Sequence, residues 1–192
     1  NDPVTLRVLN NIGINLARTG DLPGGRALFE TLLPLRTRVL GAEHEGFINT
    51  LQVLDGGRIG IAALAVGLAQ GAYEAALAYA KERRQFGQAI AEFQGIQWKL
   101  ADNATRIEAA RLLTYRAAYL RDQGARTTRE SSTAKLFASE VAVRAADDCV
   151  QIHGGYGFVK DYPAEKYFRD VKLTTIGEGA SEIQRLVIAR QL

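Results

Sequence analysis

The sequence contains no Met, one Cys, two His and four Pro among its 192 residues. Because Cys149 is the single cysteine, an intrachain disulfide is impossible, and a lone Cys in an apolar helical stretch is typical of a buried core position. No apolar run approaches the ~20 residues that span a bilayer, and Asn1-Asp2-Pro3 lacks the basic start of a signal peptide. The sequence therefore predicts a protein of the reducing cytoplasm without a membrane span. The missing Met at position 1 predicts a processed product or a fragment.

An excess of one charge is also lacking, since the formal net charge is only +3. No run of Lys or Arg stands out, so the footprint of a nucleic-acid-binding protein is absent. The apolar fraction of 47% and the charged fraction of 23% are ordinary for a globular protein. The small basic excess suits an anionic cofactor or substrate.

Strand alternation and proline are scarce, whereas apolar residues recur at helical spacing. Compact connections between long helices predict an all-α fold, an antiparallel four-helix bundle at 45–192. A smaller helical hairpin is expected to precede it at 1–44. Helices of the bundle are expected at 58–82, at 92–122, at 128–152, from Pro163 to about Asp170, and after Gly179.

The hairpin at 1–44 has a recognisable motif. The segments Leu9-Asn10-Asn11-Ile12-Gly13 and Ala17-Arg18-Thr19-Gly20-Asp21 resemble one tetratricopeptide-type repeat. A single repeat cannot bury its apolar face, since at least three are usually needed. The hairpin is therefore either an appendage without a binding role of its own or part of a peptide-binding platform.

The first of four chemically suggestive clusters is Asp55-Gly56-Gly57-Arg58. Asp55 can cap the long helix that follows, and the two glycines let a chain or ligand approach closely. Arg58 is then either a surface charge near a helix start or a binding residue.

The second cluster places Phe86 three residues after Arg83, with Gln94 further on. A guanidinium is a bidentate clamp for pyrophosphate oxygens, and the aromatic ring can cover a flat ligand. A charged helix terminus with Phe86 as an apolar plug explains the spacing equally well.

The third cluster is Gln151-Ile152-His153-Gly154-Gly155. Its glycines expose backbone N–H groups to a ligand, although a helix C-cap followed by a turn fits the spacing as well. No strand precedes it, so it is not a dinucleotide-binding G-x-G-x-x-G motif. His153 is expected to be a loop residue and not a catalytic base, because no second His or carboxylate completes a triad.

The fourth cluster is Gly177-Glu178-Gly179 followed by Ala180-Ser181-Glu182. Glu178 lies before the expected helix, where capping does not require it. A carboxylate in an apolar, glycine-walled pocket becomes a stronger base through desolvation and can remove a proton from carbon. The alternative is a solvated carboxylate in a turn.

The order and spacing of the four clusters over 45–192 resemble the helical C-terminal domain of FAD-dependent acyl-CoA dehydrogenases, with the short-chain members most similar. The resemblance implies that Glu178 is the catalytic base and that Asp55, Arg58 and Gly179 bind the acyl-CoA. The isovaleryl-type members carry their catalytic Glu directly before the Arg, where this chain has Gly57. The implied FAD contacts, several of them to the FAD of a neighbouring subunit, are Arg83, Phe86, Gln94, Gln151, Ile152, His153, Gly154, Gly155, Ala180, Ser181 and Glu182.

The reaction implied is α,β-dehydrogenation of an acyl-CoA thioester, with electrons passing to an electron-transfer flavoprotein or a similar acceptor. The family also implies a homo-oligomer, a dimer or tetramer, and no metal site is predicted. Ala180 replaces the usual Thr, and loss of one hydrogen bond to the flavin costs on the order of 1 kcal/mol.

Residues 1–44 resemble neither the N-terminal helical domain nor the middle β-domain of the family, so we expect neither domain in this 192-residue chain. We therefore expect the polypeptide alone to bind FAD poorly and to have little activity. It is either an incomplete piece of a dehydrogenase or a catalytically silent helical assembly module.

Overall fold

The computed structural model describes residues 45–192, where every element except one small hairpin is helical. The prediction of an all-α bundle is therefore confirmed, whereas the helical hairpin expected at 1–44 lies outside the described residues. The elements are α3 (Glu45–Glu82), β1 (Arg84–Gln85), β2 (Gln88–Ala89), η1 (Ile90–Glu92), α4 (Gln94–Asp122), α5 (Thr128–His153), η2 (Gly154–Phe158), α6 (Ala164–Ile176) and α7 (Ser181–Ala189).

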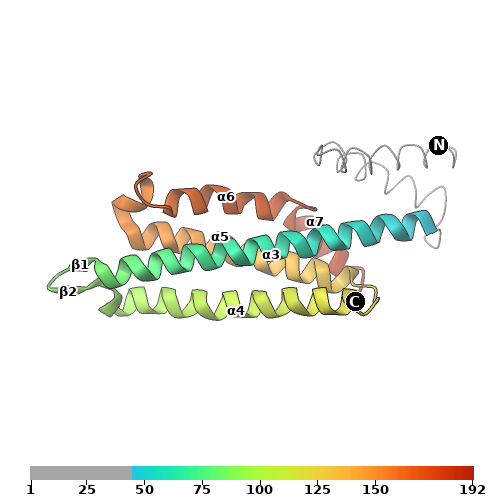
Figure 1. Cartoon of the computed structure of the whole chain (residues 1–192), viewed down its shortest axis with the longest axis horizontal. Helices are drawn as coiled ribbons and strands as arrows, with labels where there is room; N and C mark the ends of the chain where they lie inside the picture. Colours follow the sequence, from blue (N-terminus) through green and yellow to red (C-terminus); the bar gives the residue numbers. More distant parts are fainter. Residues whose placement is uncertain (1–44) are drawn as a thin grey trace. The chain divides into compact units, whose positions relative to one another are not determined.

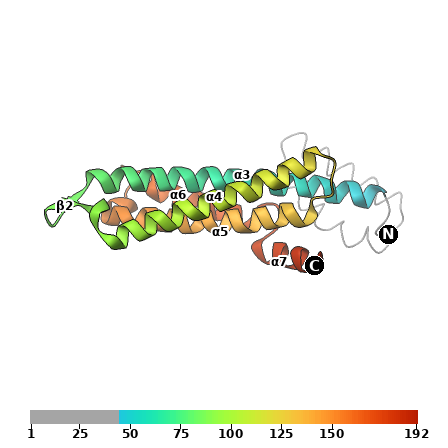
Figure 2. The same ribbon diagram turned by 90° about the horizontal axis from the view of Figure 1, so that it is seen from below.

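The chain divides into two compact units, Asn1–Asp55 and Gly56–Leu192. In the second unit, α3 from Gly56 onward, α4, α5 and α6 run side by side in alternating directions (Figures 1 and 2). Helix α5 contacts α4, α6, η2 and the short α7. The fold thus places residues from distant parts of the sequence around α5.

The core face of α3 is built from small side chains. Gly71 lies against α6, where an added Cβ would come within 2.7 Å of the Tyr167 hydroxyl. Because Ala and Gly have no side chain beyond Cβ, neighbouring helices can approach α3 closely. The buried alanines of α3, each at most 2% exposed, are Ala62, Ala65, Ala69, Ala72, Ala76 and Ala80.

Helix α3 departs from the expectation that no segment reaches the size of a membrane span. By length and composition alone, Gln52–Glu82 could cross a membrane, with a mean hydropathy of 1.4. Within this chain 28% of the apolar window is buried, and its buried residues include alanines of the core face.

Two helices are longer than the sequence pattern indicates. Helix α3 begins at Glu45 and not near residue 58, so Asp55 lies inside the helix and the prediction that it caps the N-terminus is wrong. Helix α6 continues to Ile176 instead of ending near Asp170, and Val171 and Thr174 are buried on its core side. For α6, tertiary burial therefore extends the helix beyond the bound that local signals suggest.

Candidate active site

The hairpin that follows α3 forms one end of the second unit. The sequence indicated only a polar break here, but Arg84 pairs with Ala89 in two antiparallel strands of two residues each. The φ angles of Phe86 and Gly87 are 51° and 86°, the left-handed pair that a type I′ turn requires. Strands this short cannot show a two-residue period, so the pattern could not reveal them.

The turn exposes Phe86, whose side chain is 94% accessible and makes an edge contact only with the Phe93 ring, 6.3 Å between centroids. Phe86 does not line the pocket at Arg83 that is described below. The side chains of Gln94 and Gln151 are also exposed. These predicted cofactor residues are available to a ligand or a second chain.

Helix α5 ends at His153, and the glycine-aromatic segment η2 begins there. Nδ1 of His153 donates to the carbonyl oxygen of Cys149 at 2.8 Å, and its ring stacks on Tyr79 with centroids 4.2 Å apart. The prediction that His153 is a loop residue is wrong, because it is the last residue of α5 and is buried. Next to it, burial raises the pKa of the Cys149 thiol to about 11.

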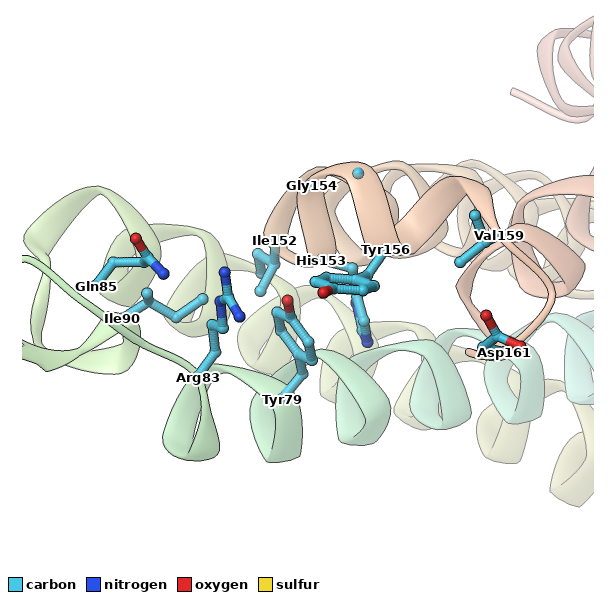
Figure 3. A pocket seen from close by; sticks show the side chains of 11 residues that line it. Tyr79, Arg83, Gln85, Ile90, Ile152, His153, Gly154, Tyr156, Val159 and Asp161 are labelled. Carbon is cyan, nitrogen blue, oxygen red and sulfur yellow. The ribbon is translucent and has the colours of Figure 1, made fainter.

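An open pocket of about 520 Å³ joins the second and third sequence clusters. Figure 3 shows Arg83 and Tyr79 reaching from the end of α3 toward Ile152, His153 and Tyr156. The Arg83 guanidinium lies 5.6 Å from the centre of the Tyr156 ring, within range of a cation–π contact. The lining comprises Tyr79, Arg83, Gln85, Ile90, Ile152, His153, Gly154, Gly155, Tyr156, Val159 and Asp161.

The fourth cluster lies in the loop between α6 and α7. Glu178 has a φ of 55° and Gly179 one of 95°, a conformation that is uncommon for a residue with a side chain. The half-buried Glu178 side chain reaches α3 beside Gly57, where an added Cβ would lie within 2.5 Å of Glu178 Cδ. The carboxylate thus fills the space that a side chain at position 57 would need, one residue before the buried Arg58.

Two fully buried side chains bind the backbone of this loop. Lys135 of α5 donates from Nζ to the carbonyl oxygen of Gly179 at 2.7 Å. Gln184 of α7 donates from Nε2 to the carbonyl oxygens of Glu178 and Gly179, each at 3.0 Å. Neither residue was assigned a role from sequence. A signal existed for Lys135, since it lies four residues from both Ser131 and Ser139, on a helix face otherwise made of small residues.

The remaining predicted cofactor residues line a smaller pocket of about 360 Å³ near the start of α7. Ala180, Ser181 and Glu182 form part of its wall, and an ion pair between Arg185 and Glu140 lies at the same place. Lys172 adds a second cationic group to the lining. The pocket is therefore polar and separate from the one at Arg83.

The β1–β2 hairpin with its pocket and the start of α7 lie at opposite ends of the second unit (Figure 1). Helix α3 alone spans roughly 38 Å from residue 57 to residue 82, at 1.5 Å per residue. No single dinucleotide bridges that distance. Among the described residues, no group of three or more His, Cys, Asp or Glu side chains could hold a metal ion.

A family model described as acyl-CoA dehydrogenase, C-terminal domain, matches residues 44–192. The chain belongs to the acyl-CoA dehydrogenase family. A tetratricopeptide repeat model matches residues 5–45, in agreement with the resemblance of the first segment.

Relatives within the acyl-CoA dehydrogenase family are close in sequence. A probable acyl-CoA dehydrogenase of Bacillus subtilis is 52% identical over 183 residues, which is 95% of this chain and 47% of the relative. The solved butyryl-CoA dehydrogenase of Megasphaera elsdenii is 44% identical with a TM-score of 0.74, over 77% of this chain and 38% of that one. A solved structure of PigA with FAD and proline is 32% identical with a TM-score of 0.72, over 79% of this chain and 39% of that one. The chain spans about half the length, or less, of each of these relatives.

Proposed function

We propose that the chain is the C-terminal part of an FAD-dependent acyl-CoA dehydrogenase in which Glu178 removes the α-proton of an acyl-CoA thioester. One observation carries this proposal: the Glu178 carboxylate lies against α3 at Gly57, next to the buried Arg58. A base needs a fixed position within reach of the proton it takes. Arg58 and Gly179 would bind the thioester end of the substrate, with Asp55 on the same helix as Arg58.

The residues present fit a flavin nucleotide. A Cβ added to Gly154 or Gly155 would meet no atom within 4 Å, so the space above these glycines is open. Arg83 supplies a guanidinium for phosphate oxygens, and Tyr156 supplies a flat face. When bound, FAD would supply the hydride acceptor; the residues of this chain bind it, orient it and move the α-proton.

We propose that each chain contacts two FAD molecules, its own and the one bound to a neighbouring subunit. Ala180, Ser181 and Glu182 would contact the flavin beside the chain's own Glu178, whereas Arg83, Phe86, Gln94 and residues 151–155 would contact the FAD of a neighbouring subunit. The roughly 38 Å that separates the two regions along α3 supports this division. The most exposed apolar side chains of α4 would be buried in such an oligomer: Trp98, Leu112, Tyr115 and Tyr119, each at least 60% exposed.

An electron-transfer flavoprotein as acceptor and a cytoplasmic location stay predictions. So does a domain boundary between residues 44 and 45. The two family models, which meet at this point, support the boundary.

Glu178→Gln tests the proposal in the flavin-loaded holoenzyme with butyryl-CoA as substrate. Loss of the base is expected to lower turnover about 10³-fold while the flavin absorption band is retained. Glu74→Gln, a change at an exposed carboxylate of α3, is the matched control and should turn over normally. Absence of turnover in the unmodified holoenzyme would favour the catalytically silent helical module, and equal, measurable rates in both proteins would place the base on another residue.

A second test concerns the 192-residue chain by itself. Because the relatives are about twice as long, we expect it to copurify with little FAD. A flavin band in stoichiometric amount would show that these residues suffice for binding.

A further inference from the structure

The buried lysine of α5 is the largest side chain that the described part of the chain encloses completely. Lys135 has no exposed surface, although lysine is almost never fully buried unless its charge is met by a partner. Its Nζ donates to the carbonyl oxygen of Gly179, 44 positions further along the chain. The positive charge of Lys135 is therefore directed at the backbone of the loop that carries Glu178.

Gln184 reaches the same loop from the opposite direction in sequence. It is also fully buried, and its Nε2 donates to two successive carbonyl oxygens, those of Glu178 and Gly179. A Cβ added at Gly179 would come within 2.6 Å of this nitrogen. The glycine and the amide are thus packed together without spare room.

The loop needs such support because its backbone is in an unfavourable conformation. Glu178 and Gly179 both have positive φ angles, and a residue with a side chain adopts that region only where the surroundings fix it. With both carbonyl oxygens bound on the inner side, the Glu178 side chain is directed at Gly57 of α3. Releasing the carbonyls would allow the loop to relax and the carboxylate to move.

We propose that Lys135 and Gln184 are positioning residues that fix the Glu178 loop in its left-handed conformation and thereby place the carboxylate beside Gly57. The consequence for catalysis rests on the proposed function of Glu178. The effect on the loop itself does not.

Hydrogen exchange of the amides at the two ends of the loop tests the inference in the 192-residue chain, because the N–H groups of Gly177 and Gln184 donate to backbone carbonyls there. Lys135→Met keeps an unbranched side chain one atom shorter and removes its donor, so exchange should accelerate about tenfold, as expected for one lost charge-assisted hydrogen bond. Lys135→Arg retains a cationic donor and should restore part of the protection. The matched control is Lys99→Met, which removes a lysine paired with the buried Asp148 and should lower the melting temperature without changing exchange in the loop.

In the flavin-loaded holoenzyme, exchange of the α-protons of butyryl-CoA with D2O reports the base directly. We expect Lys135→Met to slow this exchange about tenfold with KM nearly unchanged, because the base and not the binding of substrate is affected. Gln184→Leu, which removes the other two bonds to the same carbonyls, should act in the same way and serves if Lys135→Met does not fold.

Lys135→Met and Gln184→Leu could instead only lower the melting temperature, with loop exchange, kcat and KM all equal to those of Lys99→Met. In that case the two residues are structural and the inference is wrong. The Glu178→Gln variant separates this from failure of the proposed function. Normal turnover in Glu178→Gln with faster loop exchange in Lys135→Met would overturn the function and leave the positioning role intact.

Discussion

The two ends of the second unit differ in how far their side chains are already held in place. At the hairpin end, glycines and aromatic side chains border an open pocket, and Phe86 and Phe158 are among the most exposed large apolar residues described. At the other end, the Glu178 loop is bound by buried side chains and its carboxylate lies against α3. The hairpin end is suited to receive a ligand, whereas the loop end is already organised around one carboxylate.

Helix α5 connects the two ends and carries a buried charge near each. Asp148 is 1% exposed and accepts from Lys99, Asn103 and Arg144. Lys135 donates instead to a backbone carbonyl of the loop. The buried charge of Asp148 is surrounded by side chains of α4 and α5 and fixes helix packing. The buried charge of Lys135 binds a loop carbonyl and fixes the position of another residue.

Asp148→Ala should have the largest effect on stability at the hairpin end. Removing the carboxylate leaves Asn103 and two cations without a shared acceptor, so we expect a loss of about 2 to 3 kcal/mol. The loss stays at the lower end because the Lys99 and Arg144 side chains are 31% and 53% exposed. Urea denaturation followed by circular dichroism measures it, and an unchanged midpoint would show that the network contributes little.

Gly57→Ala should damage the loop end without destabilising the protein. The new methyl group would overlap with the Glu178 carboxylate, and displacement of a catalytic group by about 1 Å can cost up to about 100-fold in rate. Stability should stay equal or rise by roughly 0.5 kcal/mol, since Ala favours a helix over Gly. Gly60→Ala is the matched control, because a Cβ there meets nothing within 4 Å. Equal turnover in both variants would place the reacting carboxylate elsewhere.

Arg83→Met should weaken the hairpin end as a ligand site and leave the chemistry alone. We expect FAD to dissociate about tenfold more readily, since one charge-assisted contact to phosphate is lost. At saturating FAD, turnover should match that of the unmodified holoenzyme. A fall in turnover that added FAD does not restore would contradict the separation of the two ends.

Cys149 provides a test of burial at alkaline pH. Burial raises the pKa of its thiol to about 11, above the value of 9.0 expected in the unfolded chain. The thiol therefore adds stability that is fully present below pH 9 and is lost as the pH rises through 11. The free energy of unfolding should fall by up to about 2 kcal/mol more than in Cys149→Ala over this window. Parallel curves for the two proteins would indicate that the thiol ionises freely.

The helical architecture was predictable because apolar residues, many of them alanines, recur at helical spacing in α3, α4 and α5. The position of Glu178 between glycines also indicated a residue that local structure does not require. Lys135 and Gln184 could not be assigned, because each bonds to a carbonyl that only the folded chain brings near. The hairpin was missed for another reason: two-residue strands have no period, and the turn depends on a positive φ at Phe86, which local sequence preferences disfavour.

Because Gly57 has no side chain, the Glu178 carboxylate can occupy the space beside it. A Cβ at position 57 would overlap with Glu178 Oε2, so a side chain there and the Glu178 carboxylate cannot occupy this volume together. A protein with Glu at 57 and Gly at 178 would present the same group to the same volume from the other wall. The location of the base would then be inherited from the fold, while the residue that supplies it could be exchanged.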